Sequence, residues 1–207
     1  MLNRPRVRRL AAAGAEPVAR ALLQLGLGPN AVSVLGAAGV SLAALATLPF
    51  GRFGWGLLLI ALLSAGDLLD GTMARLSGRT SRWGAFLDSV VDRISDGAVL
   101  GGIALYFART DQSLLAGLAV AALLMGQVTS YTKARAESLG ATADVGVAER
   151  AERVLIVLLA LLGAALGIDW ALPLALALLT VLGMVTIGQR IIVVRRQLHS
   201  PSGLPER

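Results

Sequence analysis

Long apolar segments alternate with short polar connections along most of the chain. Six segments have the roughly 20 mostly apolar residues that a membrane-crossing helix needs, and they cover residues 31–49, 54–75, 84–108, 113–136, 150–168 and 171–194. The connections between them are too short to form a separate soluble domain. The pattern therefore predicts an all-α integral membrane protein with six transmembrane helices.

The two ends of the chain differ from this pattern. Residues 1–28 are basic and are interrupted by Glu16, Pro17 and Arg20 before any long apolar run. A cleaved signal peptide is therefore not expected, and we interpret the segment as an amphipathic helix on the membrane surface. Residues 29–196 form the predicted six-helix membrane domain, and the polar residues 197–207 are expected to be a disordered tail.

Composition and charge agree with this interpretation and orient the helices. The chain is 56% hydrophobic and has a net charge of +6. In a membrane protein such a positive charge usually reflects cytoplasmic loops that lie near anionic lipid, rather than binding of nucleic acid. If the N-terminus is cytoplasmic, only Arg52 and Arg109 lie on the outer side. Both termini are therefore expected in the cytoplasm. Because the chain has no cysteine, disulfides and thiolate metal sites are excluded.

Carboxylates are concentrated in the hairpin of the second and third apolar segments. This hairpin holds five of the chain's thirteen carboxylates, Asp67, Asp70, Asp88, Asp92 and Asp96. At about 100° per residue, Asp67 and Asp70 share one helix face, and Asp88 and Asp92 share another. Gly71 and Gly84 leave room on these faces for a second helix or a ligand. We expect Asp96 to pair with Arg93, three residues earlier.

The other four carboxylates cannot all stay ionised at partial membrane depth without a strong positive partner. One arginine supplies too little charge, whereas a pair of divalent cations supplies enough. An all-carboxylate site without histidine or cysteine favours Mg²⁺ or Mn²⁺. We therefore predict that two Mg²⁺ ions, with Mn²⁺ as the alternative, bind Asp67, Asp70, Asp88 and Asp92.

The spacing of these residues resembles the signature of the CDP-alcohol phosphotransferases. The pattern D-x2-D-G-x2-A-R…G-x3-D-x3-D is present without departure at Asp67, Asp70, Gly71, Ala74, Arg75, Gly84, Asp88 and Asp92. The resemblance implies a six-helix enzyme, with a homodimer suggested by the family, whose di-metal site cleaves the pyrophosphate of a CDP-linked lipid and releases CMP. It also implies that Asp92 is the general base for the acceptor hydroxyl, and Arg75 is suited to bind phosphate.

The stretch "GPNAVS", residues 28–33, opens the first apolar segment. Asn30 is a good N-cap and Pro29 terminates what precedes it, so the stretch predicts a helix start. It also resembles the family's Pro-Asn-x-x-Thr stretch that contacts the cytidine nucleotide, with Ser33 in place of Thr. The exposed N–H groups at a helix N-terminus are suited to bind an anion such as a phosphate. The expected CDP-diacylglycerol contacts are Pro29, Asn30, Ala31, Val32, Ser33, Gly71, Arg75 and Ser81.

Cations near the inner ends of the last three segments indicate the acceptor. Lys133 is the only lysine beside eighteen arginines, and Arg190 lies inside the last apolar span, where a lone cation is costly. The predicted phosphate pocket comprises Ser130, Lys133, Arg135, Arg153 and Arg190. We interpret Arg195 and Arg196 as membrane anchors.

A basic pocket suits an acceptor that carries phosphate. "SYTKARAE" and "GVAERAER" resemble the branch of the family whose acceptor is inositol 1-phosphate. We therefore expect transfer of the phosphatidyl group from CDP-diacylglycerol to inositol 1-phosphate, at the cytoplasmic face of the plasma membrane. Glycerol 3-phosphate, as in a phosphatidylglycerophosphate synthase, is the alternative. An ion-coupled transporter is disfavoured because the acidic residues cluster at one surface.

Overall fold

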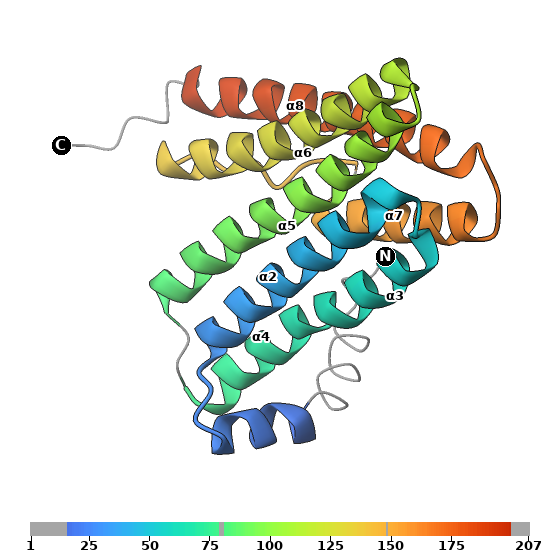
Figure 1. The fold of residues 1–207 in the computed structure, drawn as a ribbon. Coiled ribbons are helices and arrows are strands. Elements are labelled where there is room, and N and C mark those ends of the chain that lie inside the picture. The colour runs from blue at the N-terminus through green and yellow to red at the C-terminus, as the bar shows by residue number, and fades with distance from the viewer. Residues whose placement is uncertain (1–15, 79–80, 148, 200–207) are drawn as a thin grey trace. The chain divides into compact units, whose positions relative to one another are not determined.

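The computed structural model describes residues 16–78, 81–147 and 149–199. Within these ranges the chain is helical and has no strand. The helices are α2 (Pro29–Thr47), α3 (Phe53–Ser64), α4 (Gly66–Leu76), α5 (Arg82–Arg109), α6 (Ser113–Ser138), α7 (Arg150–Ala165) and α8 (Ala171–His199), with a 3₁₀ turn, η1 (Leu48–Phe50), after α2 (Figure 1). The chain divides into two compact units, Met1–Arg109 and Thr110–Arg207.

Each of the six predicted apolar segments coincides with one helix or with two successive helices. Four helical segments in the described ranges are long and apolar enough to cross a membrane: Pro29–Phe50, Phe53–Leu76, Ser113–Ser138 and Ala171–His199. α5 has 28 residues but carries aspartates and Arg93 in its first half, and α7 has 16 residues, fewer than a span usually needs. An all-helical membrane protein is therefore supported, and the count of six spans stays a prediction.

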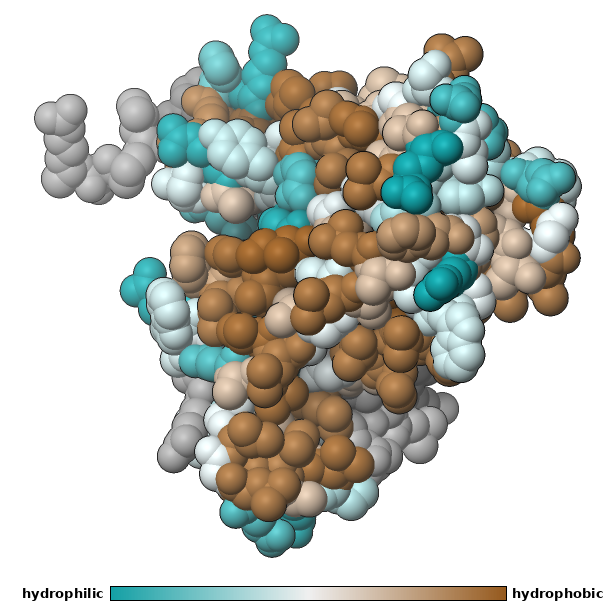
Figure 2. All heavy atoms as spheres, viewed as in Figure 1, coloured by the Kyte–Doolittle hydropathy of each residue, from teal (hydrophilic) through white to brown (hydrophobic). Residues whose placement is uncertain are grey.

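Large apolar side chains lie on the outside of these helices. Leu35 and Leu42 on α2, Leu58 and Leu62 on α3, and Ile94 on α5 are all more than half exposed. In Figure 2 apolar side chains cover much of the visible surface. A soluble protein rarely exposes so many large apolar side chains, so these helix faces suit lipid.

In the first unit, α2 packs against α5 on one side and against α3 and α4 on the other (Figure 1). Two glycines allow the close approach. A Cβ at Gly56 on α3 would lie 2.5 Å from Leu48 Cδ2, and a Cβ at Gly102 on α5 would lie 3.2 Å from the Ala44 carbonyl oxygen. Small residues at such contacts let helix backbones pack tightly where lipid surrounds the bundle.

In the second unit, α8 packs against both α6 and α7. Glycines again lie at the contacts, since a Cβ at Gly183 on α8 would lie 2.6 Å from Met125 Cβ on α6, and a Cβ at Gly163 on α7 would lie 2.6 Å from Ala171 Cβ on α8. The same packing rule therefore holds in both units.

The ends of the membrane domain differ from the predicted boundaries. Residues 16–24 are helical, as expected for the N-terminal segment, and residues 1–15 lie outside the described ranges. α8 continues to His199, so the predicted start of the tail at residue 197 is wrong by three residues. The physical reason is that the Gln197 side chain is hydrogen-bonded to Thr142, which holds the last helical turn in place. Residues 200–207 lie outside the described part.

Candidate functional site

A cavity of about 210 Å³ lies in the first unit, where the start of α2, the second half of α4 and the start of α5 meet. Seven predicted site residues line it, namely Pro29, Asn30, Ser33, Asp70, Gly71, Ser81 and Asp88, together with Ala74, Gly84 and Ala85. Residues from three separate parts of the sequence therefore line a single cavity. The motifs were predicted to serve one reaction, and this requires that their residues lie together.

The start of α2 differs in detail from the prediction. The N-cap is Gly28, and Pro29 is the first helical residue, so the prediction of Asn30 as N-cap is wrong. Proline suits this first position because its fixed φ is already helical and its missing N–H has no partner to lose. Asn30 instead lies in the first turn of α2 and lines the cavity.

Two of the residues predicted to contact CDP-diacylglycerol, Ala31 and Val32, have other neighbours. The backbone N–H groups of Ala31 and Val32 both donate to the Gly28 carbonyl, at 3.1 and 3.3 Å. Neither residue is among those that line the cavity. The part of the "GPNAVS" stretch that faces the cavity is therefore made of Pro29, Asn30 and Ser33.

Ser33 links the start of α2 to the aspartate motif. Its hydroxyl donates a short hydrogen bond to Asp70 Oδ2, and Asp70 is only 8% exposed. The buried carboxylate is therefore oriented by a hydroxyl from a different helix. Sequence reasoning predicted both residues but assigned Ser33 to the nucleotide alone, since residues 37 positions apart carry no local signal of contact.

Arg75, on α4, lies next to residues that line this cavity. Its Nη2 donates to Thr72 Oγ1 at 3.1 Å, and a Cβ at Gly71 would lie 3.7 Å from Arg75 Nη1. Because Gly71 lines the cavity, the guanidinium lies beside one of its walls. A guanidinium in that position is suited to an anionic ligand.

The start of α5 is built around Gly84. The Ser81 Oγ accepts a hydrogen bond from the Gly84 N–H at 3.0 Å, which caps the helix. A Cβ at Gly84 would lie 3.2 Å from Asn30 Oδ1 and 3.3 Å from Ser81 Oγ. Any larger residue would therefore crowd the polar groups that face the cavity.

Asp88 and Asp92 follow Gly84 on successive turns of α5. Asp88 lines the cavity. The side chain of Asp92 is 14% exposed, and its Oδ2 lies 3.9 Å from Arg93 Nη2. Arg93 Nη2 also lies 3.6 Å from Asp96 Oδ2, which confirms the predicted pair of Arg93 and Asp96.

Two carboxylate residues from different helices, Asp70 and Asp88, line the same cavity, and carboxylates are ligands that fit Mg²⁺ or Mn²⁺. Among the described side chains, no three histidine, cysteine or acidic residues lie close enough together to hold a metal ion. Asp67 belongs to α4, but its side chain lies outside the described residues. The site of four carboxylates therefore stays a prediction.

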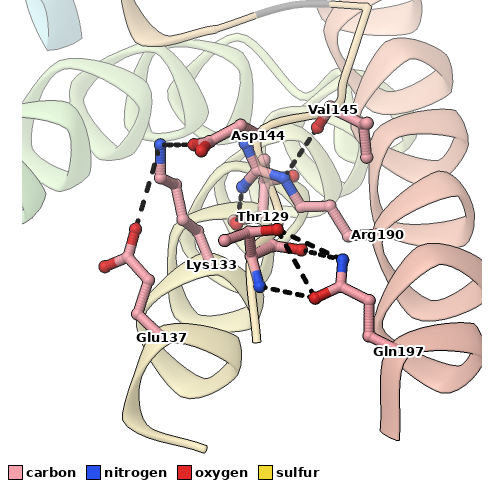
Figure 3. Close-up of polar contacts among 8 residues, drawn as sticks. Thr129, Lys133, Glu137, Asp144, Val145, Arg190 and Gln197 are labelled. Atoms are coloured by element: carbon pink, nitrogen blue, oxygen red, sulfur yellow. Dashed lines mark hydrogen bonds and ion pairs between the residues drawn. The ribbon is translucent and has the colours of Figure 1, made fainter. Parts of the chain in front are cut away.

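The predicted acceptor residues all lie in the second unit. The ammonium of Lys133, on α6, donates to Asp144 Oδ1 at 2.6 Å and lies 4.0 Å from Glu137 Oε1 (Figure 3). The hydrogen bond from Lys133, together with its charge, lowers the pKa of Asp144 below the ordinary value. Asp144 therefore carries a negative charge at neutral pH. It lies outside every motif, so its contact with Lys133 was not predicted from the sequence.

Arg190 holds the connection between α6 and α7. The residue is 6% exposed, its Nε donates to the Val145 carbonyl at 3.0 Å, and its Nη1 donates to the Thr129 carbonyl. The cost of a cation in an apolar helix is thus offset by two backbone acceptors. A guanidinium has five N–H donors, so these contacts are compatible with a further bond to an anion.

The remaining acceptor candidates lie along α6 and α7. A Cβ at Gly126 would lie 3.9 Å from Arg153 Nε, so the arginine packs across α6 at a glycine. The Ser130 hydroxyl donates to the Gly126 carbonyl at 3.1 Å, and Arg135 Nη1 donates to Ser138 Oγ at 3.3 Å. Ser130 and Arg135 therefore have local helical partners.

The contacts of Arg190 predict a loss of stability on substitution. Arg190→Gln removes charge-assisted bonds to one buried carbonyl group, that of Thr129, and one partly buried carbonyl group, that of Val145. Each bond is worth about 1.5–3 kcal/mol, so the substitution should lower the unfolding temperature of the purified protein in detergent. Arg195→Gln is the matched control, because Arg195 is an exposed cation on the same helix. Equal unfolding temperatures for the two variants would contradict the structural role of Arg190.

Residues 27–194 match the family model described as CDP-alcohol phosphatidyltransferase. The phosphatidylinositol phosphate synthase of Streptomyces avermitilis is 48% identical over 189 residues, which cover 87% of this chain and 78% of the relative. The synthase of the same name from Cutibacterium acnes is 44% identical over 193 residues, covering 89% of this chain and 93% of the relative.

Solved structures agree with these sequence relatives. The crystal structure of Mycobacterium tuberculosis phosphatidylinositol phosphate synthase with CDP-DAG bound has a TM-score of 0.83 and 36% identity, covering 93% of this chain and 98% of that one. The structure of the same synthase in complex with manganese and citrate also has a TM-score of 0.83 and 36% identity, and covers 93% of each chain.

Proposed function

The chain belongs to the CDP-alcohol phosphatidyltransferase family, as the aspartate motif predicts, and we propose that it transfers the phosphatidyl group of CDP-diacylglycerol to inositol 1-phosphate. The products are phosphatidylinositol phosphate and CMP. The names of relatives up to 48% identical support this reaction, as does a solved relative with CDP-DAG bound. In this chain, the observation that carries the proposal is the single cavity that joins Asn30 and Ser33 to Asp70 and Asp88.

The proposed metal ligands are Asp67, Asp70, Asp88 and Asp92, with two divalent cations, Mg²⁺ or Mn²⁺. The solved relative in complex with manganese supports a divalent cation in this family. When bound, the cations would neutralise charge on the pyrophosphate and on the departing CMP. The hydrogen bond from Ser33 to Asp70 supports this assignment, because it restricts the orientation of one of the proposed ligands.

The protein's own groups bind the donor and move the proton. Asn30, Ser81 and Gly84 form the part of the cavity that takes the nucleotide, and Arg75 binds a phosphate oxygen. The acceptor's hydroxyl oxygen forms a bond to the lipid-side phosphorus, the bond from that phosphorus to the bridging oxygen breaks, and CMP leaves with this oxygen. Asp92 takes the proton of the attacking hydroxyl.

The acceptor's phosphate would bind cations of the second unit. We assign this role to Lys133, Arg153 and Arg190, with Ser130 and Arg135 as further candidates, because their donors suit phosphate oxygens. Lys133 already holds one carboxylate oxygen at 2.6 Å, so its ammonium is positioned to bind an anion. The alternative acceptor is glycerol 3-phosphate, which carries the same phosphate group.

The chain is proposed to be a multi-pass protein of the plasma membrane. The exposed apolar side chains on α2, α3 and α5 and the four candidate spans support a membrane location. The distribution of arginine supports cytoplasmic termini and an active site that faces the cytoplasm. Six spans and a homodimer complete the proposal.

Gly84→Ala tests the nucleotide part of the cavity. A Cβ 3.2 Å from Asn30 Oδ1 crowds the site, and an added methyl group in a tight site costs about 1–3 kcal/mol. We expect KM for CDP-diacylglycerol to rise at least about fivefold, as measured by CMP release. Gly101→Ala, on the same helix but with no atom within 4 Å of the new Cβ, should leave KM unchanged, and equal effects of the two substitutions would contradict the assignment.

The overall reaction is tested with a panel of acceptors and labelled CDP-diacylglycerol. Purified protein should release CMP in the presence of inositol 1-phosphate and Mg²⁺ or Mn²⁺, and chelation of the metal should stop the release. Faster turnover with glycerol 3-phosphate would move the protein to a phosphatidylglycerophosphate synthase. A lack of turnover with every alcohol would instead favour an ion-coupled transporter.

A further inference from the structure

The ammonium of Lys133 is covered by a carboxylate from another segment. Asp144, in the connection between α6 and α7, accepts a hydrogen bond from Lys133 Nζ at 2.6 Å (Figure 3). The Asp144 side chain is 73% exposed and that of Lys133 is 39% exposed. The pair therefore lies at a surface that a small dissolved anion can reach.

The backbone around Asp144 is held on both sides. The Gln197 amide accepts from the Thr142 N–H and donates to the Thr142 carbonyl, each at 2.8 Å. The Val145 carbonyl accepts from Arg190 Nε at 3.0 Å. The backbone is therefore hydrogen-bonded on both sides of Asp144, whereas its exposed side chain is free of packing that would hold it on Lys133.

We propose that Asp144 occupies the place on Lys133 that the acceptor's phosphate takes, so that binding of the acceptor is an exchange of one anion for another. This inference rests on the proposed function and deepens it, since it assigns a specificity-determining role to a residue outside the motifs. An exposed ion pair is weak, whereas a phosphate group carries nearly two negative charges and three strong acceptor oxygens. A phosphate therefore displaces the carboxylate, and the neutral hydroxyl groups of free inositol do not.

Asp144→Asn tests the exchange with inorganic phosphate as the probe. The amide keeps the size of the side chain and an oxygen that accepts from Lys133, but it removes the charge of the nearer of the two carboxylates beside Lys133, while Glu137 stays at 4.0 Å. Calorimetric titration of the full-length protein in detergent should show phosphate binding about two- to fivefold tighter than for the unmodified protein, the range that an exposed ion pair supports. With Lys133→Gln as background, Asp144→Asn should have no effect, because there is no ammonium to uncover.

The matched control is Asp169→Asn, which changes the net charge equally in the connection between α7 and α8 and should leave phosphate affinity unchanged. The proposed exchange is overturned if the Asp144→Asn variant binds phosphate as weakly as the unmodified protein or more weakly. It is also overturned if the effect of Asp144→Asn persists in the Lys133→Gln background, or if Asp169→Asn tightens phosphate binding equally.

Turnover separates this inference from the proposed function. Asp144→Asn should lower KM for inositol 1-phosphate and leave KM for CDP-diacylglycerol unchanged. If the unmodified protein rejects inositol 1-phosphate while the phosphate titrations behave as expected, the acceptor is wrong and the exchange stands. If inositol 1-phosphate is a good acceptor and its KM rises in Asp144→Asn, the exchange is wrong and the proposed function stands.

Discussion

Asp92→Asn should reduce kcat by about 10²- to 10⁴-fold at saturating metal, the range expected for loss of a general base. An amide cannot take the proton of the acceptor hydroxyl, whereas it keeps the size of the carboxylate and one oxygen ligand. The fold and most of the metal affinity should therefore remain. The measurement is CMP release with CDP-diacylglycerol and inositol 1-phosphate, beside a titration of the purified variant with Mn²⁺.

Two other aspartates serve as comparisons. Asp88→Asn should raise the Mn²⁺ concentration that gives half-maximal activity, because Asp88 is proposed to bind the metal. Asp96→Asn should leave turnover close to that of the unmodified protein, because Asp96 lies one turn beyond Asp92 and pairs with Arg93 at 3.6 Å. Near-normal turnover of Asp92→Asn at saturating metal would show that another group takes the proton.

Lys133→Gln and Arg153→Gln should each raise KM for inositol 1-phosphate by roughly ten- to a hundred-fold, while KM for CDP-diacylglycerol changes little. A charge-assisted contact to phosphate is worth about 1.5–3 kcal/mol, and the lost contact belongs to one substrate only. Free inositol should be a poor acceptor before and after substitution. Steady-state kinetics with each substrate varied in turn measures both constants.

Arg195→Gln is the control for a general loss of positive charge, since Arg195 is an exposed cation near the end of α8. It should leave both KM values unchanged. Lys133 is a cleaner test than Arg190, because Lys133 is partly exposed whereas Arg190 is buried and tied to two backbone carbonyls. Equal weakening of both substrates by Lys133→Gln would assign this cation to membrane anchoring instead.

The helical segments and the family follow from short-range patterns in the sequence. Apolar runs of helical length predict helices because a backbone in lipid must satisfy its hydrogen bonds within the segment. The aspartates recur every three or four residues, so one helix turn already places each pair on a common face. The Gly71 and Gly84 positions of the motif likewise require only local spacing. The sequence alone therefore determined the type of fold and the family.

Tertiary packing decided which side chains meet and what each contact does. Ser33 reaches Asp70, Gln197 reaches Thr142, and Arg190 reaches Val145 across 37, 55 and 45 positions respectively. No periodicity links residues so far apart, because their distance depends on how whole helices pack. Asp144 illustrates this. In the sequence it is one acidic residue between two helical segments, and only the folded chain shows that it accepts a hydrogen bond from Lys133, the single lysine. A sequence pattern thus locates charges along a helix, while the partner of each charge is set by packing between helices.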